Sequence, residues 1–225
     1  MKRLNIAMDG PVGAGKSSIA DAVAARLGIL HLDTGAMYRA LGLKALRENL
    51  DVQDEERIVA LCETLNLDVR VGSNGQETLL DGEDVSGLIR TPEVSMAAST
   101  VSRYARVRQR MVSLQQELAA AQDMILDGRD ICLTVLPDAP LKIYLTASAE
   151  ERARRRWTEM QAKGEKDTFE EVLAQVKARD EQDMNRPVEP LRRAKDAVLL
   201  DTTNLTFDQV VETIVNMAEA VYHAE

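Results

Sequence analysis

Near the start of the chain stands Gly10-Pro11-Val12-Gly13-Ala14-Gly15-Lys16-Ser17. This is the complete Gly-x-x-x-x-Gly-Lys-Ser pattern of a phosphate-binding loop, in which backbone N–H groups and the positive end of the following helix surround a phosphate chain. The apolar run 4–8 precedes the loop, and apolar residues at helical spacing follow it over 19–27. The alternative, an ordinary glycine-rich turn, explains neither flank. The stretch therefore predicts a strand, a phosphate-binding loop and a helix in direct succession.

Two side chains of this loop are expected to act on the phosphates directly. Lys16 would bridge the β- and γ-phosphates of ATP, and the Ser17 hydroxyl would ligate Mg²⁺. Asp127 ends the apolar run 124–126 and is the candidate for the acidic residue that supports the same ion. Its alternative role is that of a turn residue, because Asp-Gly pairs favour turns. The residues expected to bind ATP are Gly10, Pro11, Val12, Gly13, Ala14, Gly15, Lys16, Ser17 and Ser18.

Short apolar runs alternate with helical patterns along the chain. The runs are residues 4–8, 29–32, 124–126, 141–145 and 197–200. Such alternation predicts a parallel sheet covered by helices on both faces. Gly28 is expected to cap the first helix, and Thr206 with Gln209 forms a capping box at the start of the last one. The fold class is therefore α/β, with the central parallel sheet and flanking helices of P-loop NTPases.

Two stretches interrupt this alternation. Residues 67–85 carry alternating apolar residues and the turn signals Asn74-Gly75 and Asp81-Gly82, which predict a small antiparallel meander. Residues 150–193 are strongly charged and lead to Asn185-Arg186-Pro187, which indicates an exposed, hinged segment.

Composition narrows the class of protein. With 28 basic against 37 acidic residues the net charge is −9, which argues against a nucleic-acid backbone or an anionic membrane as the main partner. The cysteines, Cys62 and Cys132, are too few for a zinc knuckle or a disulfide framework and fit burial in a reducing cytoplasm. The sequence has no run near the ~20 apolar residues of a membrane span. We expect a cytoplasmic monomer that acts on small molecules.

Three of the predicted strands end in polar turns. These are Asp9-Gly10, Asp33-Thr34-Gly35 and Asp127-Gly128-Arg129-Asp130. Ligands bind at the carboxyl ends of strands in open parallel sheets, so the three turns are expected to face one crevice. Arg129, and Arg39 one helical turn beyond Gly35, are candidates for gripping a second phosphate because a guanidinium fork matches phosphate oxygens. The alternative for any lone arginine is a solvated surface position.

A run of arginines follows the fourth predicted strand, at positions 152, 154, 155 and 156. Arginines on a closing lid stabilise the charge of a transferring phosphoryl group and exclude water. A solvated helix face is the alternative, and consecutive positions cannot share one face, so one or two would reach the phosphoryl group. The catalytic candidates are Lys16, Arg129, Arg152 and Arg156. His31 and His223 are expected to form no triad and no metal cluster.

Further motifs complete a pattern that covers essentially the whole chain. They are residues 10–18, 32–39, 81–86, 89–91, 127–130, 136–139 and 185–186. In this order they resemble the bacterial cytidylate kinases. The resemblance implies one P-loop kinase domain over residues 1–225, with an inserted monophosphate-binding lobe at about 65–103 and a mobile lid at about 150–187.

The resemblance also implies which residues surround the acceptor, CMP. They are Thr34, Arg39, Ser99, Arg108, Arg129, Asp130, Asp183 and Arg186. Ser99, Arg108 and Asp130 would address the cytosine, Arg39 and Arg129 the phosphate, and Asp183 and Arg186 the sugar. Two positions depart from the family pattern: Ile131-Cys132-Leu133 follows Asp130 where a glycine and a threonine are usual, and Met184 stands where an arginine is common.

The chemistry of cytosine gives a reason for such a set. An aspartate can accept a hydrogen bond from the N4 amino group while an arginine donates to the ring acceptors, whereas uracil would place O4 against the carboxylate. The predicted reaction transfers the γ-phosphoryl group of ATP to CMP or dCMP. The alternatives are another P-loop kinase acting on UMP, AMP or a non-nucleotide alcohol, and a nucleotide-binding switch. The chain lacks the Asn-Lys-x-Asp motif of guanine-reading switches.

Overall fold

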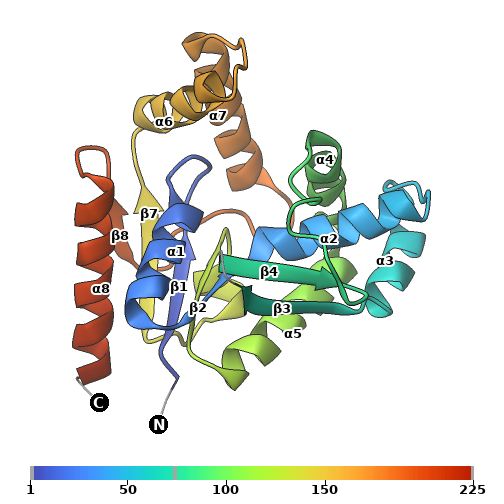
Figure 1. Ribbon diagram of the computed structural model, residues 1–225, viewed down its shortest axis with the longest axis horizontal. Coiled ribbons are helices and arrows are strands. Elements are labelled where there is room, and N and C mark those ends of the chain that lie inside the picture. The colour runs from blue at the N-terminus through green and yellow to red at the C-terminus, as the bar shows by residue number, and fades with distance from the viewer. Residues whose placement is uncertain (1–2, 73–74, 224–225) are drawn as a thin grey trace.

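The computed structural model describes residues 3–72 and 75–223, and its centre is a parallel sheet (Figure 1). Within these residues the sheet has five strands in the order β2-β6-β1-β7-β8. The strands are β1 (Asn5–Asp9), β2 (Leu30–Asp33), β6 (Met124–Gly128), β7 (Leu141–Thr146) and β8 (Val198–Asp201). Each of the five apolar runs in the sequence forms one of these strands, which confirms the predicted α/β class.

The register of the sheet brings its polar carboxyl ends together. Asp9 pairs with Gly128 across β1 and β6, and Asp33 pairs with Asp127 across β2 and β6. All of these pairings are parallel, so the chain leaves β1, β2 and β6 at the same edge. The turns that follow these strands therefore share one side of the sheet.

Helices cover both faces of the sheet. The helices are α1 (Lys16–Leu27), α2 (Thr34–Arg47), α3 (Glu55–Glu63), α4 (Pro92–Val101), α5 (Ala105–Ala121), α6 (Ala149–Ala162), α7 (Phe169–Asn185) and α8 (Phe207–His223), with a π-helical turn η1 (Ile131–Val135). Alternate residues of a strand point to opposite faces. Ile6 and Met8 of β1 accordingly pack in one core with α1 and α8, while Ala7 packs in the other with α2 and α5.

Local signals set the ends of these helices. Gly28 caps α1 in the left-handed conformation, with φ 68°. The Thr206 hydroxyl accepts from the Gln209 amide at 3.3 Å, and the Gln209 side chain accepts from the Thr206 amide at 2.9 Å. Both predicted caps are confirmed. None of the helices within residues 3–72 and 75–223 is long and apolar enough to cross a bilayer.

A second, antiparallel sheet lies beside α2 and confirms the predicted meander. Its strands are β3 (Leu67–Gly72), β4 (Gly75–Leu80) and β5 (Glu83–Asp84). Asp81 and Gly82 have φ 53° and 85° and form the two-residue turn between β4 and β5. The other expected turn, Asn74-Gly75, begins outside the described residues. Val69, Leu80 and Val85 join the apolar core of α2, so this small lobe is packed onto the main sheet.

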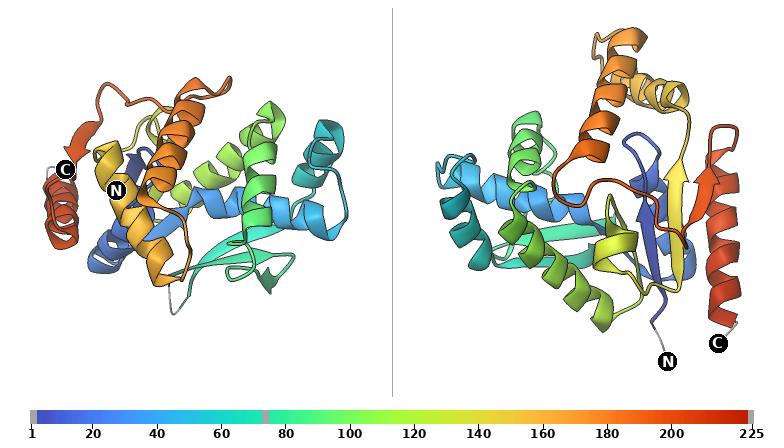
Figure 2. Two further views of the ribbon diagram at one scale, coloured as in Figure 1. Left: turned by 90° about the horizontal axis from the view of Figure 1, so that it is seen from above. Right: turned by 180° about the vertical axis from the view of Figure 1, so that it is seen from behind.

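Helices α6 and α7 form a hairpin above the carboxyl edge of the sheet (Figures 1 and 2). The hairpin has its own small core of Ala153, Val172 and Val176. Trp157 and Phe169 close its end in an edge-to-face contact, with ring centroids 6.4 Å apart. The side chain of Val12, from the glycine-rich loop, packs against this core. The hairpin is therefore a folded unit, and the phosphate-binding loop is one of the segments that it contacts.

Candidate active site

A cavity of about 720 Å³ opens at the carboxyl edge of the sheet. The phosphate-binding loop, α2, α4, the turn after β6 and the α6–α7 hairpin all contribute to its walls. Of the described residues, ten basic and five acidic ones line it. A chain with net charge −9 thus gathers an excess of positive charge in one place, which is the electrostatic character of a site for anions.

The loop 10–18 takes a conformation that requires its glycines. A Cβ on Gly10 would lie 2.0 Å from the carbonyl oxygen of Leu145, and Gly15 adopts the left-handed φ of 86° immediately before α1. In the described part of the chain no side chain caps the start of α1. Its first N–H groups are therefore free to bind an anion. Val12, Gly13, Gly15, Lys16, Ser17 and Ser18 line the cavity, whereas Gly10, Pro11 and Ala14 are not part of its lining.

Lys16 is buried and folded over its own loop. Its Nζ donates to the carbonyl oxygens of Gly10 and Pro11 at 2.8 and 2.9 Å. Burial lowers the pKa of Lys16 to about 7, and the nearby charge of Arg129 adds to this effect. An anion beside Nζ would favour the charged ammonium form, as expected of a phosphate-binding lysine.

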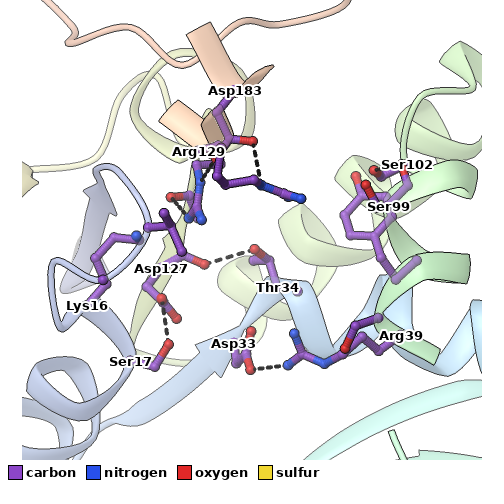
Figure 3. A pocket seen from close by; sticks show the side chains of 18 of the residues that line it. Lys16, Ser17, Asp33, Thr34, Arg39, Ser99, Ser102, Asp127, Arg129 and Asp183 are labelled. Atoms are coloured by element: carbon purple, nitrogen blue, oxygen red, sulfur yellow. Dashed lines mark hydrogen bonds and ion pairs between the residues drawn. The ribbon is translucent and has the colours of Figure 1, made fainter. Parts of the chain in front are cut away.

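Ser17 and Asp127 lie together at the floor of the cavity (Figure 3). The Ser17 hydroxyl donates to Asp127 Oδ2 at 3.0 Å, and Thr34 Oγ1 donates to the backbone oxygen of Asp127 at 2.8 Å. Burial acts to raise the pKa of Asp127, but a hydrogen bond and the charge of His31 outweigh it and lower the pKa. Asp127 is therefore an ionised, buried carboxylate next to the phosphate-binding loop.

His31 contacts Asp127, which the sequence analysis did not anticipate. His31 Nε2 lies 2.8 Å from Asp127 Oδ1, and Nδ1 lies 2.6 Å from Asp21 Oδ1. Burial acts to lower the pKa of His31, but its hydrogen bonds to Asp127 and Asp21 prevail and raise it to about 10. Strand parity explains this contact. Ile125 packs in the α1 core, so Asp127, two residues further along β6, and His31, which pairs with Ile125 in β2, face α1 as well. The side chain of His223 lies outside the described residues.

All eight residues assigned to the acceptor by the resemblance line the cavity. Figure 3 shows Ser99, Ser102 and Arg39 across the cavity from Lys16, with Thr34 between them. Arg39 Nη2 donates to Asp33 Oδ2 at 2.6 Å. The sequence analysis missed Ser102 and Tyr38, which also line the cavity. Tyr38 lies one helical turn after Thr34, so helical spacing could have found it.

Asp130 lies in a cluster of buried charges. Arg108 Nη2 donates to Asp130 Oδ2, and Arg186 Nη2 lies 3.3 Å from Asp130 Oδ1. Glu189, which the sequence analysis did not single out, accepts from Arg108 Nε at 2.9 Å and from Nη2 at 2.6 Å. The Arg108 guanidinium also stands over the Tyr38 ring, 5.9 Å from its centroid. Aromatic face and carboxylates together fix the orientation of this guanidinium.

Asp183 orients two further arginines. Its Oδ2 accepts from Arg129 Nε at 2.7 Å, and its Oδ1 lies 3.2 Å from Arg179 Nε. In the described part of the chain, the buried Nε of the cavity-lining Arg39 lacks a hydrogen-bond partner, whereas Arg186 Nη2 is paired with the Asp130 carboxylate. Buried donors normally find an acceptor, so Arg39 Nε fits a site that takes an anionic ligand.

The arginines of α6 have different positions. Arg156 is exposed, lines the cavity, and makes no hydrogen bond or ion pair with the residues that the structure describes. Arg152, also predicted to act on the phosphoryl group, is instead 5% exposed and lies outside the cavity lining. It donates to Asp180 at 2.6 and 2.9 Å and to the carbonyl oxygens of Val12 and Ala147, each at 2.9 Å. The structure thus assigns Arg152 to fastening the hairpin onto the loop.

The two departures from the family pattern have clear positions. Ile131 begins the turn η1, and its amide and that of Cys132 both donate to the carboxylate of Asp9 at 2.9 Å. The buried Asp9 thereby holds the turn that carries Asp130, without the usual glycine and threonine. Met184 is 51% exposed on α7.

The fold and this cavity define the class of the protein. One half of the cavity holds a glycine-rich phosphate-binding loop with a buried lysine, and the other half is lined by arginines. This arrangement is that of a P-loop kinase, which phosphorylates a small acceptor. The comparisons with known proteins identify the family within that class. A family model described as cytidylate kinase matches residues 6–220. The chain therefore belongs to the cytidylate kinase family.

Individual relatives agree with the family model. The chain is 48% identical over 217 residues to the cytidylate kinase of Caldicellulosiruptor saccharolyticus and 46% identical over 217 residues to that of Enterococcus faecalis, covering 96% of each protein and of this chain. Among solved structures, an uncharacterised protein from Eubacterium ventriosum shares the fold with TM-score 0.55 at 11% identity, over 97% of this chain and 99% of its own.

Proposed function

We propose that this protein transfers the γ-phosphoryl group of ATP to CMP or dCMP and releases ADP and CDP or dCDP. The observation that carries the proposal is the single cavity that holds both the phosphate-binding loop and the Arg108–Asp130–Arg186 cluster. The loop suits the triphosphate, and the cluster suits a second, smaller anion with a polar base. Two such ligands in one cavity permit direct, in-line transfer without a covalent intermediate.

The protein's oxygen donors fit Mg²⁺, the ion that accompanies ATP. Within residues 3–72 and 75–223 no cluster of three His, Cys, Asp or Glu side chains could hold a metal ion. Mg²⁺ commonly takes one or two protein oxygens, with phosphates and water supplying the rest. Ser17 and Asp127, joined at 3.0 Å, are the residues that would hold it. The bound ion would neutralise charge that develops on the phosphates.

The protein's side chains would divide the remaining work between the two ligands. Lys16 and the N–H groups at the start of α1 would bind the phosphates of ATP, and Arg129 and Arg39 would bind the phosphate of CMP. Asp130 would accept a hydrogen bond from the cytosine N4 amino group while Arg108 donates to the ring. Ser99 would join them at the base, and Asp183 and Arg186 would face the sugar.

Two segments would control access to this cavity. We infer that residues of about 65–103 form the monophosphate-binding lobe and residues of about 150–187 form a mobile lid. Arg156, free and facing the cavity, is the lid arginine suited to the transferring phosphoryl group. Closure would exclude water, which would otherwise hydrolyse ATP. We further propose that the enzyme works in the cytoplasm as a monomer.

A coupled assay of ADP release over CMP, dCMP, UMP, AMP and shikimate tests the proposal. We expect kcat/KM to be highest for CMP or dCMP. Fastest turnover with another acceptor would reassign the substrate, and ATP-dependent turnover with none of them would contradict a kinase of this family. Lys16→Met is the control and should lose activity about a hundredfold or more while its melting temperature stays close to that of the unaltered protein. Normal turnover in this variant would refute the role of Lys16.

A further inference from the structure

A chain of polar side chains runs from the surface of α1 to the phosphate-binding loop. Asp21 begins it on α1, with its side chain 57% exposed. His31 and Asp127 follow with side chains only 5% exposed, and the Ser17 hydroxyl ends the chain at the cavity. The contacts measure 2.6 Å from Asp21 to His31, 2.8 Å from His31 to Asp127 and 3.0 Å from Ser17 to Asp127.

The donors and acceptors along this chain have a definite order. An ionised carboxylate can only accept hydrogen bonds, so each ring nitrogen of His31 must donate to the carboxylate that it faces. The imidazole is thereby held at both ends. Asp127 Oδ1 is used by His31, which leaves Oδ2 beside Ser17. A buried carboxylate oxygen without such a donor would cost free energy. The hydrogen bond from His31 therefore favours the rotamer of Asp127 in which Oδ2 faces Ser17.

We propose that His31 is a positioning residue for phosphoryl transfer. It holds the Asp127 carboxylate so that Oδ2 faces Ser17 and the cation that accompanies the nucleotide, and Asp21 holds His31 in turn. The proposal rests on the proposed function, because the cation site is part of that function. Groups that orient a metal-binding carboxylate in this manner set the affinity of the metal as well as the rate.

Two substitutions of His31 separate positioning from packing. The amide nitrogen of glutamine can take the place of Nε2, so His31→Gln retains a donor for Asp127. The amide nitrogen of asparagine corresponds to Nδ1, so His31→Asn retains only a donor for Asp21. Both variants replace an aromatic ring with a smaller amide in the same buried position, and we expect comparable losses of thermal stability.

The direct measurement is the binding of Mn²⁺ to the protein in the presence of ADP, followed by electron paramagnetic resonance. We expect His31→Asn to weaken Mn²⁺ binding about tenfold, and His31→Gln to stay within about threefold of the unaltered protein. Asp21→Ala should weaken it in the same direction by about twofold to threefold. Binding of ADP without any divalent cation should change by less than about twofold in all three variants.

Several results would overturn the proposal. Equal weakening of Mn²⁺ binding in His31→Asn and His31→Gln would leave His31 with a packing role only. Unchanged Mn²⁺ affinity in His31→Asn, or an equal loss of ADP binding without cation, would remove the link to Asp127. These measurements involve no acceptor, so a failure here is distinct from a failure of CMP in the substrate panel.

Discussion

Asp130→Asn removes the negative charge that would face the base of the acceptor. Asp130 is 7% exposed and lies between Arg108 and Arg186. Burial acts to raise its pKa, but the charge of Arg108 and its other polar neighbours outweigh burial and keep the pKa below its ordinary value. The carboxylate is therefore ionised at neutral pH. Asparagine has nearly the same shape but places an NH₂ donor where one acceptor oxygen stood.

The size of the effect follows from these contacts. CMP would lose a charged acceptor for its N4 amino group, worth about 1.5–3 kcal/mol, while UMP would gain a donor for O4, worth about 0.5–1.5 kcal/mol. The asparagine side chain can rotate so that its oxygen accepts the hydrogen bond from CMP, which restores part of the lost binding free energy. We expect the ratio of kcat/KM for CMP to that for UMP to fall by about 2–3 kcal/mol, or about 30- to 150-fold.

Steady-state ADP release with CMP and UMP measures this ratio, and Glu189→Gln is its matched control. Glu189 contacts the same guanidinium of Arg108, and its substitution removes the same charge, but its side chain is 31% exposed. The control should change the ratio by less than about threefold. The reasoning is refuted if folded Asp130→Asn keeps the ratio of the unaltered protein, or if both variants lower it equally. Circular dichroism establishes that each variant is folded.

Three further substitutions or treatments probe the support of the site. Arg152→Ala should lower the free energy of unfolding by about 3 kcal/mol, because the substitution leaves the half-buried carboxylate of Asp180 unpaired. Denaturation in urea measures this free energy. A lower kcat at unchanged stability would contradict the fastening role of Arg152. Asp9→Asn should accelerate hydrogen exchange at the amides of Ile131 and Cys132, since its side chain has one acceptor oxygen and an NH₂ group that cannot accept from the other amide. Unchanged exchange would argue against Asp9 as the support of this turn. Burial raises the pKa of the Cys62 thiol to about 11. Iodoacetamide at about pH 8.5 should therefore label Cys62 only after unfolding, as measured by mass spectrometry. Rapid labelling of the native protein would contradict the burial of this thiol.

Those parts of the fold that local chemistry determines were predictable from the sequence. Residues 5–9 form a strand because their apolar side chains fill cores on both faces of the sheet, and Gly28 ends α1 because it adopts a left-handed φ that other residues resist. The turn at Asp81-Gly82 has the same cause. In each of these places the signal lies within a few residues of the structure that it specifies.

The parts that the sequence did not reveal depend on distant segments. Arg152 and Arg156 have the same chemistry and lie one helical turn apart. Arg152 binds the carbonyl oxygen of Val12 and the carboxylate of Asp180, whereas Arg156 lines the cavity. Glu189 contacts Arg108 and has a left-handed backbone conformation, with φ 48°. Such contacts join residues that are 28 to 140 positions apart, so neighbouring residues carry no sign of them.

The α6–α7 hairpin is bound to the tip of the glycine-rich loop, and this contact couples the positions of the two segments. The carbonyl oxygen of Val12 accepts from Arg152, and a Cβ on Gly13 would come within 3.2 Å of Arg152 Cβ. The hairpin and the tip of the phosphate-binding loop therefore share contacts and cannot shift independently at this point. A triphosphate that changed the conformation of this loop would therefore move the contacts of the hairpin as well.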